Sequence, residues 1–187
     1  MKIISSNRTI YLTTDTHWNH ERILLYDSRP FDNVKEMNEY IISQISDIVQ
    51  DGDILIHLGD VIFKDRNLLK GYMERIKGYK ILLKGNHDRN TLSWYTRNGF
   101  DYVCRRYEYK NIIFSHKPMD MSENKIQYNI HGHFHKKDNP KCDRENGGLR
   151  YKYDFYNEKR NLCLYIDDIP DWKPIKLEDF LKLKTHI

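Results

Sequence analysis

The sequence predicts an α/β fold in which short buried strands alternate with amphipathic helices. Short apolar runs recur along the chain, and several of the segments between them carry apolar residues at helical spacing. Several of the apolar runs are also closely followed by an Asp, Asn or His residue. Because ligands bind beyond the carboxyl ends of the strands in open α/β sheets, we expect these polar residues to gather at one edge of a sheet.

Length and composition are typical of one globular domain. The chain has 187 residues, of which 39% are hydrophobic and 31% charged, and no apolar run is long enough for a membrane helix. The N-terminal residues lack the apolar stretch of a signal peptide, and the three cysteines lack metal-type spacing, so we expect a cytoplasmic protein with reduced thiols. A formal net charge of +4 favours an anionic substrate but predicts no strong nucleic-acid binding.

The first strand is expected at residues 9–14, and its exit loop carries Asp15, His17 and His20. Asp15 and His17 are two residues apart, so in an extended chain their side chains would point the same way, as two ligands of one metal would need to. His20 either caps the segment that follows or reaches a phosphate of the substrate.

A helix is predicted over residues 34–50, because its apolar residues form a stripe that can cover one face of the sheet. The next strand, at residues 54–58, is followed by Gly59 and Asp60, where the glycine lets the backbone approach the site closely. His57 lies inside this strand, and we interpret it as a core residue or as a partner of a metal ligand.

A second helix is predicted over residues 65–77, and a strand at residues 79–83 then leads into a Gly-Asn-His-Asp turn. The turn follows a buried strand, so it is placed where α/β folds bind their ligands. The polar side chains that it presents are those of Asn86, His87, Asp88 and Arg89.

A short helix is predicted over residues 90–98. Residues 101–110 predict a single strand, which a tight turn joins to a partner strand at residues 112–115. His116 and Lys117 follow that partner strand. The next apolar run leads into three histidines, which are His131, His133 and His135.

The chain beyond these histidines is rich in Lys, Arg and Tyr. Residues 136–160 are interpreted either as a substrate-facing flap or as a solvated connection. Residues 150–156 and 161–167 alternate in polarity and predict a closing hairpin. Residues 176–184 predict a short amphipathic helix.

The side chains at the predicted strand ends form a donor set of carboxylates, an amide and imidazoles without a thiolate. Such donors suit Mn, Fe, Zn or Ni rather than a soft metal. One ion cannot use so many ligands, whereas two ions about 3.5–4 Å apart can share them through a bridging carboxylate, and such a pair clamps a phosphate and activates water. The candidate ligands are Asp15, His17, Asp60, Asn86, His116, His133 and His135.

His87 lies beside a candidate ligand but is not needed to complete either metal site, so it is a candidate catalytic residue. It could donate a proton to a leaving alkoxide, and Asp88 could orient its ring and hold it charged. Alternatively, His87 binds the substrate phosphate as a cation and transfers no proton. Further candidates for substrate contacts are His20, Arg89 and Lys117.

The ordered series of motifs resembles the calcineurin-like metallophosphoesterase superfamily. The matches span residues 15–135, about two-thirds of the chain, and five motifs in order are far more specific than any one alone. The sequence of residues 15–31 is also similar to a small branch of that superfamily, which is found in bacteria and their phages. The motifs are D-x-H at Asp15 and His17, G-D at Asp60, G-N-H-D at residues 85–88, His116, and G-H-x-H at residues 132–135.

The resemblance implies an αββα sandwich of two mixed sheets flanked by helices, and two divalent transition-metal ions, with Mn favoured over Fe, Ni or Zn. The first ion would be held by Asp15, His17, Asp60 and His135. The second would be held by Asp60, Asn86, His116 and His133, with Asp60 as the bridge. His87 would be a general acid or a phosphate ligand, and His131 would be structural.

We therefore expect a two-metal phosphoester hydrolase in a bacterium or a phage-infected cell, with attack by a metal-bridging hydroxide. A small nucleotide-type phosphodiester is the favoured substrate, because the sequence shows no obvious arginine pair for a dianionic phosphate. A phosphomonoesterase and a nuclease are the enzymatic alternatives. A catalytically silent metal-binding scaffold is the non-enzymatic alternative, which the complete ligand set disfavours.

Overall fold

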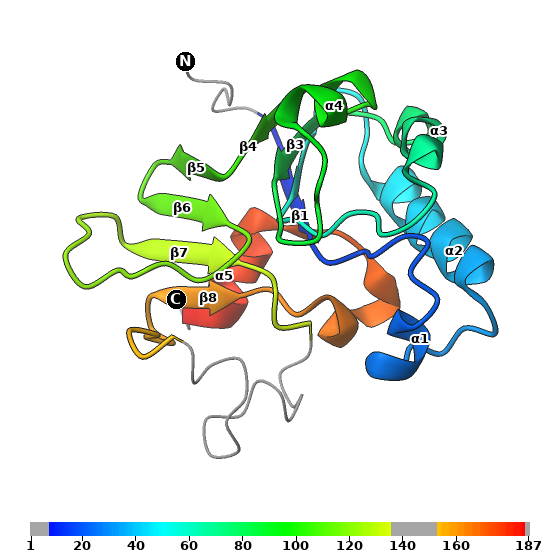
Figure 1. Ribbon diagram of the computed structural model, residues 1–187. Helices are drawn as coiled ribbons and strands as arrows, with labels where there is room; N and C mark the ends of the chain where they lie inside the picture. The colour runs from blue at the N-terminus through cyan, green and yellow to red at the C-terminus, as the bar shows by residue number, and fades with distance from the viewer. Residues whose placement is uncertain (1–7, 136–152, 186–187) are drawn as a thin grey trace.

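The computed structural model describes residues 8–135 and 153–185 of the chain. Within these residues the strands form two sheets, and the longer helices lie beside one of them (Figure 1). This arrangement follows from the alternation of apolar runs and amphipathic segments in the sequence.

In its described part, the first sheet contains, in spatial order, β4 (Tyr102–Cys104), β3 (Tyr79–Leu83), β2 (Ile54–His57), β1 (Ile10–Thr13) and β9 (Ile175–Lys176). The first four strands in this order are parallel, and β9 is antiparallel to β1. All residues of β1 and β2 are buried, as expected for central strands covered on both faces.

The second sheet contains, in the described residues, β5 (Arg106–Tyr109), β6 (Ile112–Ser115), β7 (Tyr128–His131) and β8 (Asn161–Cys163). β5 and β6 form an antiparallel hairpin, whereas β6, β7 and β8 are parallel. Both sheets are therefore mixed, and each has parallel strands whose carboxyl ends can present ligands.

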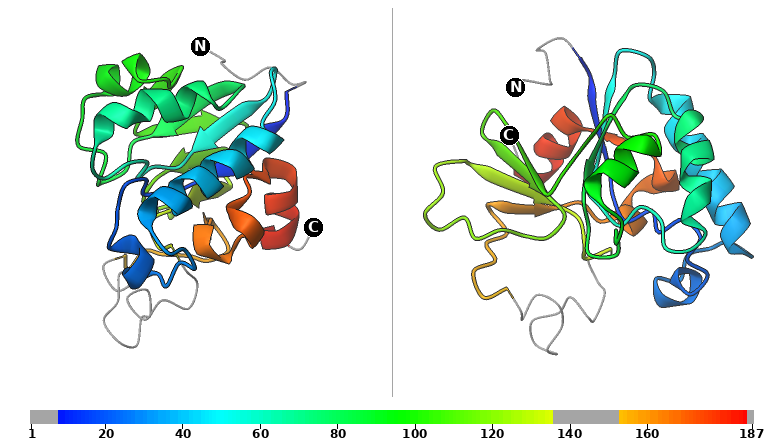
Figure 2. Two further views of the ribbon diagram at one scale, coloured as in Figure 1. Left: turned by 90° about the vertical axis from the view of Figure 1, so that its right-hand side faces the viewer. Right: turned by 45° about the horizontal axis from the view of Figure 1, so that its top comes forward.

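Helix α2 (Val34–Ile48) begins at Asn33, whose side chain accepts a hydrogen bond from the backbone N–H of Glu36 at 2.9 Å. Its buried stripe packs on the first sheet, on the face that points away from the second sheet. α2 and α3 (Leu69–Glu74) lie side by side there, as both views of Figure 2 show. The shorter helices α1 (Ile23–Tyr26) and α4 (Leu92–Arg97) complete this layer.

The second core lies between the two sheets. Leu12 and Ile56 of the first sheet and Phe114 and Ile130 of the second are fully buried in it. Phe180 of α5 (Leu177–Thr185) packs into the same cluster. Because the sheets share this core, the loops that follow their parallel strands meet at one end of the molecule.

The prediction of one strand over residues 101–110 is wrong. Residues 102–104 belong to the first sheet as β4, and residues 106–109 belong to the second sheet as β5. The chain changes sheet at Arg105. The sequence does not reveal the change, because no glycine or proline interrupts residues 102–109.

The predicted closing hairpin is also wrong. Residues 161–163 form β8, which pairs in parallel with β7 instead of with residues 150–156. Residues 153–156 form a turn-containing segment, and the rest of the predicted partner lies outside the described residues. The same holds for residues 136–152 of the predicted flap.

The αββα class is confirmed as two mixed sheets with flanking helices. The four helices predicted from apolar periodicity are present, although the one at residues 65–77 begins with a 3₁₀ turn at Arg66–Leu68. Further 3₁₀ turns occur at Ile166–Asp168 and Pro170–Trp172. Among the described residues, no helix is both long and apolar enough to cross a membrane.

Candidate metal centre

The loops after five parallel strands bring the predicted ligands together between the two sheets. In the first sheet, the loops after β1, β2 and β3 carry Asp15, Asp60 and Asn86. In the second sheet, β6 ends directly before His116, and β7 ends two residues before His133. The ligands thus come from both sheets and converge only because the sheets are packed together.

Asp15, His17 and His135 form a first cluster, in which one donor atom of each residue lies within 4.8 Å of the others. The Nε2 atoms of His17 and His135 are 3.1 Å apart, and His135 Nε2 lies 3.5 Å from Asp15 Oδ1. Two imidazole nitrogens and a carboxylate oxygen that face one another in this way are suited to a shared cation.

Asp60, His116 and His133 form a second cluster with the same 4.8 Å limit. His116 Nε2 lies 3.3 Å from Asp60 Oδ2 and 3.0 Å from Asn86 Oδ1. Asp60 Oδ2 is also 3.9 Å from His17 Nε2, so this carboxylate stands between the two clusters. That position agrees with the bridging role that the resemblance implies.

Each of the two aspartates has one occupied and one free oxygen. Asp15 Oδ2 accepts hydrogen bonds from Thr14 Oγ1 at 2.6 Å and from the backbone N–H of His133 at 2.9 Å. Asp60 Oδ1 accepts one from the backbone N–H of His87 at 2.8 Å. Asp15 Oδ1 and Asp60 Oδ2 are buried and have no hydrogen-bond partner among the described residues. Since unpaired buried oxygens are costly and both face imidazole nitrogens, the donors fit divalent transition-metal ions.

Two of the imidazoles are oriented through their second nitrogen. His116 Nδ1 is 2.9 Å from the Leu58 carbonyl oxygen, and His135 Nδ1 is 2.6 Å from Asp27 Oδ2. Because both partners can only accept, each Nδ1 must carry the proton. Nε2 of each ring is then left to bind a metal, as is usual for histidine ligands.

The charges of the cluster suit metal binding. Burial alone would lower the pKa of His116, but the adjacent Asp60 carboxylate raises it to about 9. Burial also opposes ionisation of Asp60, yet His116 holds the pKa of that carboxyl well below its usual range. Burial, together with the charge of His116, lowers the pKa of His133 to about 2. At neutral pH, Asp60 is therefore ionised and His133 is neutral, which are the forms that bind metals, whereas His116 carries a proton on Nε2 that a metal ion would displace.

The ligand loops turn sharply in the left-handed region. The φ angles are 44° at Asp15, 49° at His17 and 56° at Asp60. This corrects the expectation that Asp15 and His17 share an extended segment, since their side chains converge through two left-handed residues. Such strained positions are typical of functional sites. Gly85 allows the two ligand loops to approach each other closely, because a Cβ there would collide with the Asp60 carboxylate.

Asp88 fixes the two ligand loops to each other. Its Oδ2 accepts hydrogen bonds from the backbone N–H groups of Asp60 and Gly85, each at 2.8 Å, and its Oδ1 accepts one from Val61 N at 3.1 Å. The described contacts include no hydrogen bond between Asp88 and His87, so they do not support the expectation that Asp88 orients the His87 ring. Burial raises the pKa of the Asp88 carboxyl, and the three backbone donors oppose that rise.

The residues proposed for substrate contact lie at the rim. The His87 side chain is 40% exposed, with its Nε2 atom 4.0 Å from Asp60 Oδ2. His20 stacks on Phe63 with ring centroids 4.0 Å apart and lies 5.6 Å from the His17 ring. Arg89 and Lys117 are exposed on the loops that carry the second cluster.

Sequence reasoning missed three charged residues that support the site. Arg29 is buried, and its guanidinium pairs with Asp167 at 2.8 Å. It also donates hydrogen bonds to the carbonyl oxygens of Thr16 at 3.0 Å and Asp15 at 2.9 Å, which fixes the first ligand loop. Asp27 orients His135 as described above. For Asp27 and Arg29, the only sequence signal was the resemblance around residues 15–31, which assigned them no role, and Asp167 lies outside that stretch.

Two further histidines are structural, as expected. His57 is buried, accepts a hydrogen bond from Gly59 N at Nδ1 at 3.1 Å, and lies 3.0 Å from Thr16 Oγ1 through Nε2. Burial lowers the pKa of His57 to about 3. His131 is buried, with its Nε2 atom 3.2 Å from the Tyr156 hydroxyl.

Comparisons with known proteins give a family match and one relative over most of the chain. A family model described as calcineurin-like phosphoesterase matches residues 8–176. An uncharacterized protein of Methanocaldococcus jannaschii is 32% identical over 183 residues, which cover 95% of this chain and 92% of that protein.

Two solved structures are also similar to the chain. A protein of unknown function from Aquifex aeolicus aligns with a TM-score of 0.65 and 25% identity, over 95% of this chain and 100% of that one. A nuclease of Pseudomonas putida aligns with a TM-score of 0.48 and 18% identity, over 67% of this chain and 61% of that one.

Proposed function

The chain belongs to the calcineurin-like phosphoesterase family, and from this premise we propose that it is a phosphodiesterase that uses two divalent metal ions. We propose a small nucleotide-type diester as its substrate and Mn as its preferred metal, ahead of Fe, Ni and Zn. The observation that carries the proposal is the pair of buried, unpaired oxygens, Asp15 Oδ1 and Asp60 Oδ2, each beside imidazole nitrogens.

The protein would hold the ions through ligands that are already positioned. Asp15, His17, Asp60 and His135 would bind one ion, and Asp60, Asn86, His116 and His133 the other. When bound, two such ions neutralise the charge of a phosphate and lower the pKa of water. The hydrogen bonds of Asp27, Leu58 and Asp88 hold the ligand side chains and loops in place before the substrate binds.

His87 is the residue proposed to donate a proton to the leaving oxygen. Its side chain is 40% exposed, whereas those of His17 and His116 are each 3% exposed, so it can reach a substrate that the ligands cannot reach directly. Its backbone N–H donates to Asp60 Oδ1, which keeps the ring at the edge of the site. Transfer of its ring proton to the leaving oxygen as the P–O bond breaks would yield a neutral alcohol.

The arrangement of cations favours a diester over a monoester. Arg29 is the arginine whose guanidinium reaches the ligand loop, but its donors are already engaged by Asp167 and two backbone carbonyl oxygens. It therefore cannot bind the additional charge of a dianionic phosphate. Arg89 and Lys117 are exposed, which suits the single charge of a diester better.

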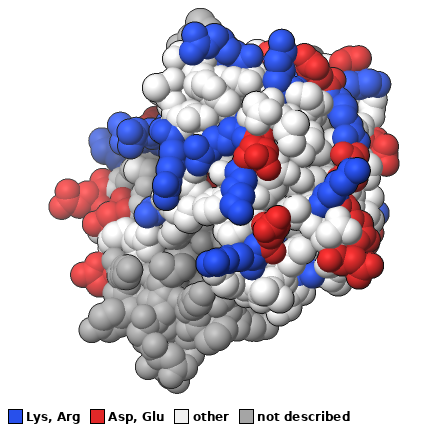
Figure 3. All heavy atoms as spheres, turned by 45° about the vertical axis from the view of Figure 1, so that its right-hand side comes forward, with Lys and Arg blue, Asp and Glu red and all other residues white. Residues whose placement is uncertain are grey.

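The molecular surface favours a small substrate. On the described part of the face shown in Figure 3, Lys and Arg side chains lie together with Asp and Glu side chains, whereas a duplex-binding surface carries basic side chains alone. A cytoplasmic location is proposed because Cys104 is a free thiol.

The test is metal-dependent turnover of synthetic substrates. The protein is stripped with a chelator, reloaded singly with Mn, Ni, Zn or Mg, and assayed on bis-p-nitrophenyl phosphate and on p-nitrophenyl phosphate. We expect turnover of the diester that needs added metal and falls sharply in Asp60→Asn. Turnover of the monoester alone would make the protein a phosphatase. Tightly bound ions without turnover of either compound would refute the enzymatic function and favour a metal-binding scaffold.

A further inference from the structure

A pocket of about 540 Å³ opens between the chain that follows β2 and the chain that follows β3. These are the same two segments that carry Asp60 and Asn86 to the candidate metal centre. The volume is within the range of small-molecule sites. Because none of the candidate metal ligands lines this pocket, it is distinct from the metal centre.

Phe63 connects the pocket with the metal centre. It lines the pocket, and its ring centroid lies 5.8 Å from that of His87. On the opposite wall, Asn90 lies three residues beyond His87. A substrate whose leaving oxygen meets His87 would therefore extend past Phe63 into the pocket.

The pocket is predominantly cationic. Lys64, Arg66 and Lys70 line it, and Asp65 is the acidic residue among the lining side chains. Lys64 and Lys70 each approach a glutamate, Glu21 at 4.0 Å and Glu74 at 3.9 Å, but all four side chains are more than 60% exposed. Exposed pairs of this kind are weak, so both ammonium groups are available to an anionic ligand.

Arg66 provides a more specific signal than the lysines. Its Nε atom is buried, yet no residue in the described ranges accepts a hydrogen bond from it. A buried donor normally has an acceptor, and a guanidinium whose Nε lacks one inside the fold can turn toward a phosphate oxygen in the pocket. Trp94 supplies an aromatic side chain on the wall formed by α4, so a planar group can pack beside the anion.

We propose that this pocket binds a second phosphate of a nucleotide substrate, on the leaving-group side of the scissile bond. Arg66 would bind the phosphate oxygens, Lys64 and Lys70 would add positive charge, and Phe63 and Trp94 would contact the sugar or base. The inference rests on the proposed function, because that function places the scissile phosphate at the metal centre.

Inhibition of bis-p-nitrophenyl phosphate turnover by two thymidine nucleotides tests the pocket. The 5′-monophosphate carries one phosphate, whereas the 3′,5′-bisphosphate carries a second one across the sugar. We expect the inhibition constant of the bisphosphate to be at least about 10-fold lower, as one charge-assisted hydrogen bond provides. Arg66→Gln and Lys70→Gln should each reduce this ratio and its dependence on salt.

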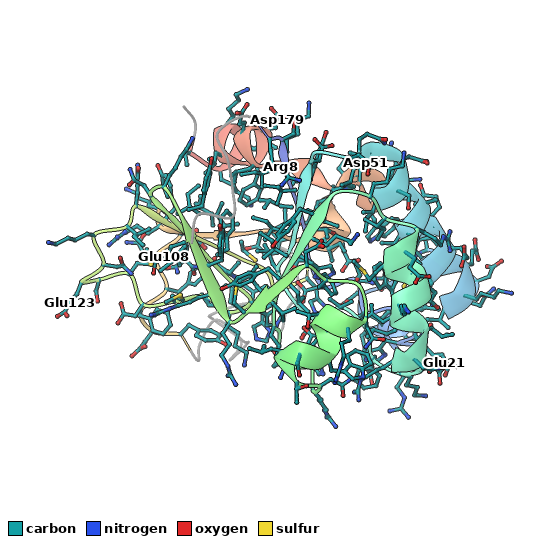
Figure 4. The ribbon with its side chains drawn as sticks, turned by 90° about the horizontal axis from the view of Figure 1, so that it is seen from above. Arg8, Glu21, Asp51, Glu108, Glu123 and Asp179 are labelled. Carbon is teal, nitrogen blue, oxygen red and sulfur yellow. The ribbon has the colours of Figure 1, made fainter. Side chains whose placement is uncertain are left out.

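Lys182→Gln is the matched control. Lys182 is 67% exposed and pairs with Asp179 on its own helix, much as Lys70 is 63% exposed and pairs with Glu74. In Figure 4, Asp179 lies at the edge of the molecule opposite Glu21, the partner of Lys64. The ratio of inhibition constants should be the same in Lys182→Gln as in the wild type.

Equal inhibition constants for the two nucleotides in the wild type would overturn the inference, as would an unchanged ratio in both pocket variants. Propane-1,3-diol bisphosphate, which has no base, should inhibit more weakly than the nucleotide, and equal inhibition would overturn the nucleotide assignment. A wild type that turns over no diester with any metal would refute the proposed function instead. Calorimetric titration of the metal-loaded protein with the same nucleotides would then measure binding to the pocket independently of turnover.

Discussion

Asp27 and His135 form a hydrogen bond of 2.6 Å although they are 108 residues apart in the sequence. Asp27 directly follows α1, and His135 lies beyond β7, so the bond joins the chain after α1 to the chain after β7. It places the His135 proton on Nδ1 and turns Nε2 toward Asp15 Oδ1, 3.5 Å away. The first cluster of candidate ligands therefore depends on a carboxylate that lies outside that cluster.

Asp27→Asn should weaken binding of the first metal. The amide still accepts a hydrogen bond but has no charge to hold the His135 ring, and loss of such partners typically costs about 10–100-fold in metal affinity. Titration against a competing chelator measures the change. Asp32→Asn, at an exposed aspartate five residues away, is the control, and equal affinities in the two variants would show that Asp27 does not position the ligand.

Arg29→Met should destabilise the metal-free protein by about 3–5 kcal/mol, because it leaves the buried Asp167 carboxylate without its counter-charge. It also removes the donors to the Asp15 and Thr16 carbonyl oxygens. Urea unfolding in the presence of chelator gives the free energy of unfolding.

Arg75→Met is the control for this loss. Arg75 also forms a 2.8 Å ion pair, with Glu39, but the two side chains are 43% and 51% exposed. Its removal should cost about 1 kcal/mol or less. If Arg29→Met and Arg75→Met lower the free energy of unfolding equally, the buried Arg29–Asp167 pair stabilises the fold no more than an exposed pair does.

His87→Ala should keep both metals and lose rate in proportion to the difficulty of the leaving group. General acids contribute about 10²–10⁴-fold, so a diester with an alkyl alcohol leaving group should lose that much turnover. Bis-p-nitrophenyl phosphate should lose far less, since p-nitrophenolate leaves without protonation. Equal losses on both substrates would assign His87 to phosphate binding.

Protonation of His57 should contribute to acid unfolding. Its pKa is about 3 in the folded protein because of burial, against an ordinary value of 6.5, so below pH 6.5 the unfolded chain binds the additional proton. The stability contribution of neutral His57 is complete above pH 6.5 and is lost as the pH falls toward 3. The difference in unfolding free energy between the wild type and His57→Gln should change by up to about 1.4 kcal/mol per pH unit in this window.

Urea unfolding in chelator between pH 4 and pH 8 tests this dependence. The difference in unfolding free energy between the wild type and His57→Gln should be constant above pH 6.5 and should shrink below it. If the free energies of unfolding of the two proteins run parallel over the whole pH range, folding does not lower the pKa of His57 and the prediction is wrong.

The sequence predicted the elements that depend on local pattern, and it identified the candidate ligands that follow them. Apolar runs such as that at residues 79–83 are followed by polar side chains. Because the carboxyl ends of parallel strands lie at one edge of a sheet, Asn86 and Asp60 are brought to the same edge. The helix over residues 34–50 was equally clear, because its stripe must face a sheet.

The remaining features depend on contacts between distant segments. Asp88 looked like a partner of His87 because they are adjacent in sequence, but its carboxylate is held by backbone N–H groups that only the folded loops bring together. Asp27 and Arg29 carry no local signal, since their partners are contributed by other elements. The change of sheet at Arg105 is likewise set by packing, because no glycine or proline marks it within residues 102–109.

The most direct test of the account is diffraction from crystals soaked in Mn²⁺, with anomalous signal used to place the ions. The account predicts two peaks about 3.5–4 Å apart, as in other two-metal sites, on either side of the Asp60 carboxylate. One peak should lie beside His17 and His135, and the other beside His116 and His133. A single peak, or peaks away from these clusters, would contradict the two-metal site.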